Sequence, residues 1–233
     1  MSALGELLRE PAKARNGAET RKPPMRMERA VRSEPLARSS LWEEQIHSLI
    51  QRLFLGRSSA PVRRVGFAPI EAQAQTGRLC LDVANALAAE CGYEVGLIDA
   101  GISGHPLSAE LQIRVSAGAP PPWAIAPRLW LAPRESWCEQ DIEHPASDKN
   151  IERLRELTSE FDFSIVHFSA VSWHTANMAH SCDGVVLVIT ANQTRRLVAA
   201  QIRDQLSKSY VPMLGAVLAE RRFPVPEGLY RSL

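Results

Sequence analysis

One segment, residues 70–80, stands where a phosphate-binding loop is expected, but its residue types do not support that chemistry. An apolar stretch precedes it, an alanine-rich stretch follows it, and a second apolar stretch ends at Asp99. A phosphate loop in this place reads G-x-x-x-x-G-K-[ST], because its glycines let backbone N–H groups surround the phosphates, its lysine neutralises them and its hydroxyl holds Mg²⁺. This segment contains Gly77 followed by Arg78, with no lysine and no Gly-Lys-Ser/Thr sequence. We interpret it as a phosphate-handling scaffold that has lost its chemistry.

Three residues remain candidates for binding a nucleotide cofactor: Gly77, Arg78 and Asp99. Arg78 falls at the start of a predicted helix, where the helix dipole favours an anion, so it is a candidate for holding a phosphate. Asp99 is either the remnant of a catalytic carboxylate or a local cap at the end of its strand, and capping is the commoner role. We assign no residue to catalysis or to a metal.

The histidines and cysteines do not form a metal-binding pattern. His167, His174 and His180 lack the i, i+4 helix spacing and have no cysteine pair beside them, so we expect them to be hydrogen-bonded or exposed. The cysteines are scattered, as expected for reduced thiols of a cytoplasmic protein. Cys80, within the altered loop, is either a reactive thiol or a small buried side chain, and burial is favoured.

Composition limits the classes of function that remain. The chain has 233 residues, 45% of them hydrophobic, which is enough for the core of one α/β domain. A net charge of +1 provides little long-range attraction to nucleic acid or to an anionic membrane. No apolar run reaches the length of a transmembrane helix, and the N-terminus lacks the apolar core of a signal peptide.

The pattern of apolar residues predicts a flexible tail over 1–38 and an α/β domain over 39–233. The tail is rich in arginine and proline and contains no aromatic residue. Alternating strands and helices in the domain predict an α/β fold with a mostly parallel sheet and helices on both faces. We expect helices at 40–56, 76–91, 150–161 and 194–206, and strands at 62–68, 94–99, 128–132, 164–168, 185–189 and 213–218.

The remainder of the segment 102–150 is predicted to be irregular, because it is proline-rich and shows no sustained periodicity. It also contains three tryptophans, Trp123, Trp130 and Trp137. With their proline neighbours they either form a partner-binding surface or pack in the core, and the sequence does not separate the two.

Several segments share their pattern with one known family. Residues 183–188 followed by 194–196 are similar to its "aDgvvLVv…kTrr" strand and helix, and 215–218 followed by 221–231 to its "GvVLN.RrfpIPe.lYr" ending. Residues 90–100 are similar to its "esGrrVLLIDaD" strand. The chain therefore resembles, over about residues 42–233, the cytoplasmic kinase domain of bacterial tyrosine kinases of capsule and exopolysaccharide biosynthesis. That family belongs to the MinD/ParA-type P-loop ATPases, so the resemblance implies their fold.

The chain departs from the family pattern at the residues that bind the phosphates, the metal ion and the adenine base in that family. When the loop is aligned from the preceding strand, Thr76 takes the position of the lysine. In the other alignments, Leu79 takes the position of either the lysine or the Mg²⁺-binding hydroxyl. His167 stands in place of a metal-site aspartate, and Gly101 in place of the second acidic residue of "IDaD". Ala219 replaces an adenine-contacting asparagine. Simultaneous loss of the phosphate cradle, the metal ligands and the base contact is hard to reconcile with ATP turnover.

Two further family features are absent. The ring-assembly motif E-x-x-R-x-x-R begins here with Glu44, but His47 and Ile50 occupy its arginine positions. The tyrosine-rich tail that the family phosphorylates is represented only by Tyr230. A homo-oligomeric ring and phosphorylation of a tyrosine cluster are therefore not expected.

The resemblance and the departures together imply a pseudo-kinase or pseudo-ATPase, without a cofactor, that acts as a regulator or scaffold in exopolysaccharide or capsule synthesis and export. Its implied partners are an inner-membrane polysaccharide co-polymerase or glycosyltransferase component, or an active paralogue, and not nucleic acid. It would be cytoplasmic and recruited to the inner membrane by that partner. The alternative is a divergent ATP-binding tyrosine kinase or ATPase with a rebuilt site that uses ATP and Mg²⁺ through Arg78, Asp99 and His167. An ATPase that positions DNA or membrane sites fits less well.

Overall fold

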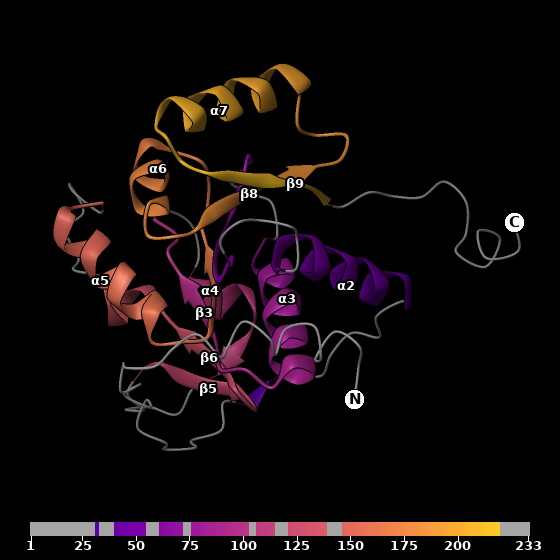
Figure 1. Cartoon of the computed structure of the whole chain (residues 1–233), viewed down its shortest axis with the longest axis vertical. Helices are drawn as coiled ribbons and strands as arrows, with labels where there is room; N and C mark the ends of the chain where they lie inside the picture. The colour runs from indigo at the N-terminus through magenta and orange to yellow at the C-terminus, as the bar shows by residue number, and fades with distance from the viewer. Residues whose placement is uncertain are drawn as a thin grey trace, which may run out of the picture.

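The structure is a computed structural model that describes residues 31–32, 40–54, 61–71, 76–102, 106–114, 121–138 and 146–219. Figure 1 shows strands and helices alternating along this part of the chain. The helices are α2 (Ser40–Phe54), α3 (Thr76–Cys91), α4 (Leu107–Glu110), η2 (Arg134–Ser136), α5 (Asp148–Ser159), α6 (Trp173–Ala179) and α7 (Arg196–Lys208). The strands are β1 (Val31–Arg32), β2 (Arg64–Pro69), β3 (Val95–Asp99), β4 (Ile113–Arg114), β5 (Trp123–Ala126), β6 (Leu129–Ala132), β7 (Phe163–His167), β8 (Gly184–Thr190) and β9 (Met213–Ala219).

Seven strands form one sheet in the order β5-β6-β3-β7-β2-β8-β9. Every neighbouring pair is parallel except β5 and β6, which are antiparallel. The predicted α/β fold with a mostly parallel sheet is therefore confirmed. Within the predicted tail, β1 pairs with β4; the rest of residues 1–38 and the motif at 221–231 lie outside the described residues.

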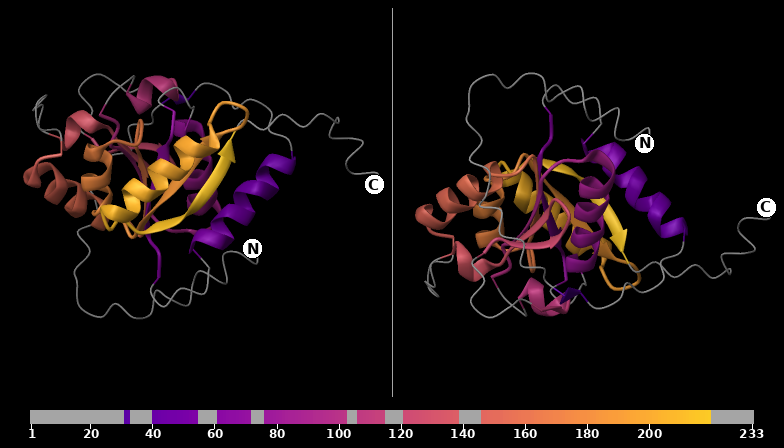
Figure 2. Two further views of the ribbon diagram at one scale, coloured as in Figure 1. Left: turned by 90° about the horizontal axis from the view of Figure 1, so that it is seen from above. Right: turned by 90° about the horizontal axis from the view of Figure 1, so that it is seen from below.

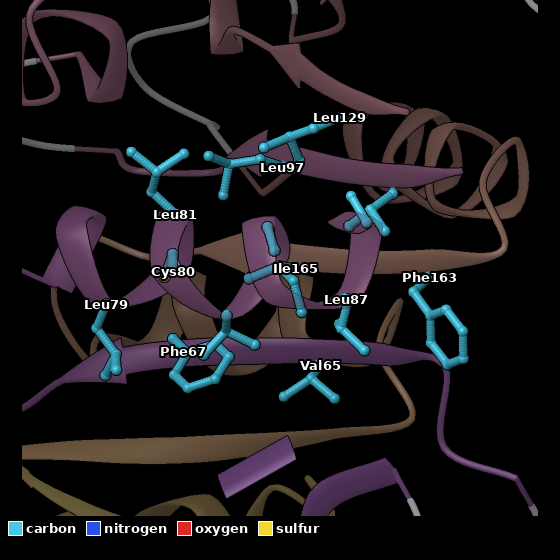
Figure 3. Close-up of a cluster of buried hydrophobic side chains, with 14 of the residues drawn as sticks. Val65, Phe67, Leu79, Cys80, Leu81, Leu87, Leu97, Leu129, Phe163 and Ile165 are labelled. Atoms are coloured by element: carbon cyan, nitrogen blue, oxygen red, sulfur yellow. The ribbon is translucent and has the colours of Figure 1, made fainter. Parts of the chain in front are cut away.

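Helices cover both faces of the sheet, and each face has its own core. Side chains alternate along a strand, so Val186 and Val188 of β8 pack with α2 and α3, whereas Val185 and Leu187 pack with α5, α6 and α7. Figure 2 shows these two groups of helices on opposite sides of the sheet. The close-up in Figure 3 shows side chains of α3 among those of β2, β3 and β7.

The segment 102–150 departs most from the sequence expectation. The strand expected near 128–132 is present as β6, but β5 adds an antiparallel edge strand, and α4 and η2 are short helices in regions predicted to be irregular. Elements this short show too few repeats of a hydrophobic period to be recognised. Trp130 and Trp137 are buried, which supports core packing for these two residues.

Helix α2 packs on α3 through its apolar stripe and two polar contacts. Trp42 Nε1 donates a hydrogen bond to Asp82 Oδ2 at 2.8 Å, and His47 Nε2 pairs with the carboxylate of Glu90. Ile50, at the second arginine position of the ring motif, is fully buried. In the family that this chain resembles, positions 47 and 50 carry the arginines of the ring-assembly motif. In this chain, His47 and Ile50 at these positions hold α2 against the rest of the fold.

The His47–Glu90 pair makes the stability of this helix pair depend on pH. Burial alone would lower the pKa of His47, but the hydrogen bonds and charges of Glu90 and Glu43 outweigh it and raise the pKa above 6.5. Because the folded-state pKa is raised, the stabilisation is fully present below the unfolded pKa and is lost as the pH rises through the folded one. In denaturant unfolding, His47→Gln should therefore cost more stability at about pH 5.5 than at about pH 8.5.

His180→Gln is a matched control, since His180 is an exposed histidine. It should show no such pH-dependent difference from the wild-type chain. An equal cost of His47→Gln at both pH values would contradict the ion pair.

Candidate functional site: the N-terminus of α3

The first turn of α3 lies beyond the carboxyl end of β2, where the sequence predicted the altered phosphate loop. There the Gly77 N–H donates a hydrogen bond to Glu110 Oε1 at 2.9 Å. A Cβ atom at Gly77 would lie 2.5 Å from Leu107 Cδ1 and 2.6 Å from Glu110 Oε1. A side chain at position 77 would therefore force the buried Leu107 side chain and the Glu110 side chain of α4 to shift. The carboxylate of Glu110 takes the place at this helix end that an anionic ligand would take.

Asp99, the last residue of β3, caps local backbone groups. Its Oδ1 accepts a hydrogen bond from the Gly101 N–H at 3.0 Å, and its Oδ2 accepts one from the Leu107 N–H at 2.8 Å. Leu107 is the first residue of α4 and is fully buried. Asp99 thus holds α4 at its start, in agreement with the capping role expected from the sequence.

His167, the last residue of β7, lies between the two carboxylates. The sheet register places it opposite Asp99, so that its Nδ1 is 3.5 Å from Asp99 Oδ1 and its Nε2 is 3.9 Å from Glu110 Oε2. Its side chain is 6% exposed, and Nδ1 has no hydrogen-bond partner. The expectation that this histidine is hydrogen-bonded or exposed is therefore wrong, because adjacent parallel strands end together and bury it between acids.

The other two histidines are not part of this cluster. His174 stacks beside Trp173 with ring centroids 3.6 Å apart, and its Nδ1 is also buried without a hydrogen-bond partner, which again differs from the expectation. His180 is exposed, as expected.

Arg78 does not point its charge at the helix end. Its Nε lies 3.4 Å from Asp82 Oδ1, one turn further along α3. Asp82 is buried and also accepts the hydrogen bond from Trp42. The guanidinium is therefore engaged with a carboxylate of its own helix, and the assignment of Gly77, Arg78 and Asp99 to a nucleotide site stays a prediction.

The carboxylates of this site also act on the thiol of Cys80. Burial raises the pKa of the Cys80 thiol well above its ordinary value, and the nearby carboxylates of Glu110 and Asp99 raise it further. Cys80 is fully buried, which confirms the expected structural role over a reactive one. A polyphosphate placed here would meet the same two carboxylates.

These residues do not fit a Mg²⁺-nucleotide. The Gly77 N–H is already paired with Glu110, and Arg78 is paired with Asp82. The buried carboxylate of Asp99 adds a second negative charge near the helix end. Among the described residues, no group of three His, Cys, Asp or Glu side chains is arranged to hold a metal ion. A cavity of about 580 Å³ does exist, but its lining residues, among them Pro122, Trp137 and Arg153, belong to the β5–η2 region and α5.

Glu110 is the residue of this site that the sequence did not reveal. It lies in a four-residue helix within a segment that we expected to be irregular, and no motif points to it. Only the path of the chain after β3 brings it back to the start of α3. The Arg78–Asp82 pair did have a sequence signal, namely opposite charges at i and i+4.

Comparison with known proteins identifies the fold. No protein-family model and no curated protein matches this chain. Among solved structures, the chimerical protein CapA2B2 has a TM-score of 0.65 at 14% identity, with 78% of this chain and 85% of that one covered. The kinase domain of the Escherichia coli tyrosine kinase ETK has a TM-score of 0.56 at 18% identity, covering 79% of each chain. A ParA family ATPase from Chlorobium tepidum has a TM-score of 0.54 at 16% identity, covering 67% and 73%.

The structural neighbours are thus bacterial tyrosine kinase domains and ATPases of the MinD/ParA type, whose fold this chain shares. At these identities the likeness concerns the fold, and function has to be argued from the site. Among the described residues, no helix is long and apolar enough to cross a membrane.

Proposed function

We propose that this chain is a non-catalytic regulator or scaffold in bacterial exopolysaccharide or capsule synthesis and export. In this proposal the chain is a pseudo-kinase that has the fold of a tyrosine kinase domain but has lost its nucleotide chemistry. The shared fold and the motifs at 183–188 and 90–100 support the family, and the altered loop at 70–80 supports the loss of activity.

The observation that carries the proposal is the carboxylate of Glu110 on the Gly77 N–H. A phosphate at a helix N-terminus is held by free N–H groups and by the positive end of the helix dipole. Here an internal anion uses that N–H, and Asp99 adds a second negative charge nearby. A nucleotide would have to displace one carboxylate and tolerate the other, with no lysine in residues 70–80 to compensate.

The proposed partners follow from the family and not from a surface in the structure. They are an inner-membrane polysaccharide co-polymerase or glycosyltransferase component, or an active paralogue with which this chain competes. Such a partner would recruit the chain to the cytoplasmic face of the inner membrane. Neither ATP nor Mg²⁺ takes part.

The experiment that tests the proposal is a calorimetric titration of the purified chain with ATP and ADP, with and without Mg²⁺. We expect no binding heat up to millimolar nucleotide, whereas an active kinase domain of the same fold gives a saturable signal. Saturable Mg²⁺-dependent binding that weakens in Arg78→Ala would overturn the proposal. It would favour the alternative, a divergent ATP-binding kinase with a rebuilt site.

A further inference from the structure

We propose that the cavity beside the β5–η2 region and α5 is a docking site for a basic segment of the same chain, residues 21–26 (Arg-Lys-Pro-Pro-Met-Arg). The cavity adjoins the core that α5 forms with the sheet, whereas α3 packs in the other core. The contact is therefore separate from the site at the N-terminus of α3 and does not depend on the proposed function.

The cavity combines apolar and acidic side chains. Its volume is about 580 Å³, and Pro122, Trp137 and Leu157 supply apolar surface. The two glutamates Glu156 and Glu160 of the α5 region also line it and are exposed, as is the third lining glutamate, at position 135. A ligand that fits this cavity carries apolar groups for the first set and positive charge for the second.

The negative charge of the cavity is not balanced within the described part of the chain. Three glutamates and one arginine, Arg153, line the cavity, and none of these glutamates forms an ion pair with a described residue. Burial raises the pKa of the Glu160 carboxyl, and the charge of Glu156 raises it further. A cation placed beside the two carboxylates would offset their repulsion and favour the ionised form of Glu160.

The segment 21–26 matches both properties of the cavity. Arg21, Lys22 and Arg26 supply three positive charges, and a guanidinium pairs with a carboxylate through two parallel hydrogen bonds. The pair Pro23-Pro24 is apolar, and aromatic-lined grooves commonly bind proline. Residues 1–38 contain 9 of the 27 Lys and Arg and 5 of the 26 Asp and Glu, so they carry a net +4 and residues 39–233 a net −3. This division of charge favours contact between the two parts of the chain.

The path of the chain brings the segment within reach of the cavity. The backbone of Val31 pairs with that of Arg114, and Arg114 precedes Pro121 by seven residues. An extended chain spans at most about 3.6 Å per residue, so Arg114 lies within about 25 Å of Pro121, which lines the cavity. Arg21 precedes Val31 by ten residues, which span up to about 36 Å. Ten residues are thus long enough to bring Arg21 to the cavity.

The first test compares backbone amide NMR signals of the full chain as wild type and after charge reversal of the segment. The 21–26 reversal combines Arg21→Glu, Lys22→Glu and Arg26→Glu. We expect it to move the signals of the cavity residues Ser136, Leu157 and Glu160, because the paired charges are lost. The matched control reverses three other charges of residues 1–38 and should leave these signals in place: Arg9→Glu, Lys13→Glu and Arg15→Glu.

Reversal of the cavity charge provides the reciprocal test. Glu156→Lys combined with Glu160→Lys should move the signals of residues 21–26. Combination with the 21–26 reversal should restore the contact, since the charges are then exchanged and again opposite. The signal differences between wild type and either reversal should shrink as NaCl rises from about 0.1 M to about 1 M.

A titration with a synthetic peptide of residues 19–28 identifies the occupant of the cavity. The chain with the 21–26 reversal should bind the peptide about tenfold more tightly than wild type, whose own segment competes at an effective concentration in the millimolar range. Equal affinity for the two chains would overturn the proposal and assign the cavity to a basic segment of another protein. Cavity signals that depend on protein concentration would assign it to a second copy, and cavity signals that the 21–26 reversal leaves unmoved would also overturn the contact.

Discussion

Replacement of Asp99 by alanine is expected to lower the free energy of unfolding by about 2–4 kcal/mol. The carboxylate accepts hydrogen bonds from the Gly101 and Leu107 N–H groups, and the residue Asp99 is 3% exposed. Alanine leaves the Leu107 N–H without its acceptor at the buried start of α4. Weaker repulsion with Glu110 offsets part of this loss, so the cost lies below the sum of two charged hydrogen bonds.

Denaturant unfolding of Asp99→Ala, Asp99→Asn and Asp204→Ala measures this effect. Asparagine keeps one acceptor oxygen, so it should cost less than alanine. Asp204 is exposed and pairs with its neighbour Arg203, so Asp204→Ala should stay within about 0.5 kcal/mol of wild type. If Asp99→Ala were as stable as wild type and abolished nucleotide binding, Asp99 would be a catalytic remnant and not a cap.

The sheet and its long helices could be predicted from the sequence because their hydrophobic patterns repeat often enough. The expected helix 76–91 is observed as α3 with the same bounds, and the strands expected at 164–168 and 185–189 are β7 and β8 with small shifts at their ends. The alternation of these elements implies parallel pairing and helices on both faces. Burial of both faces of the sheet then follows from the packing of these helices, so the fold can be predicted without knowing the function.

The candidate site was predictable only in part, since it depends on contacts between segments distant in the chain. The sequence located Gly77, Arg78 and Asp99, and the family pattern placed His167 at the end of a strand. The sequence does not show that His167 lies opposite Asp99, because the register of β3 and β7 sets that pairing. The sequence also does not show that Glu110 lies at the start of α3, because α4 has only four residues and is too short to show a helical hydrophobic period.

Gly77→Ala is expected to destabilise the chain, although glycine is a poor helix residue. The new Cβ would overlap Leu107, which is buried, and the Glu110 carboxylate, and relief of such overlap costs about 1–3 kcal/mol. Higher helix propensity of alanine offsets up to about 1 kcal/mol of this. The net loss should appear in denaturant unfolding, together with faster hydrogen exchange in α4.

The sign of this effect separates two reasons for a glycine at position 77. If Gly77 served only to let a phosphate approach, the space beside it would be open in the free protein, and alanine would stabilise α3 by about 1 kcal/mol. If Gly77 makes room for α4, alanine destabilises, and the loss shrinks when Glu110→Ala removes one of the overlapping groups. A coupling of at least about 0.5 kcal/mol in that double-mutant cycle would show that the two positions act as one closed contact.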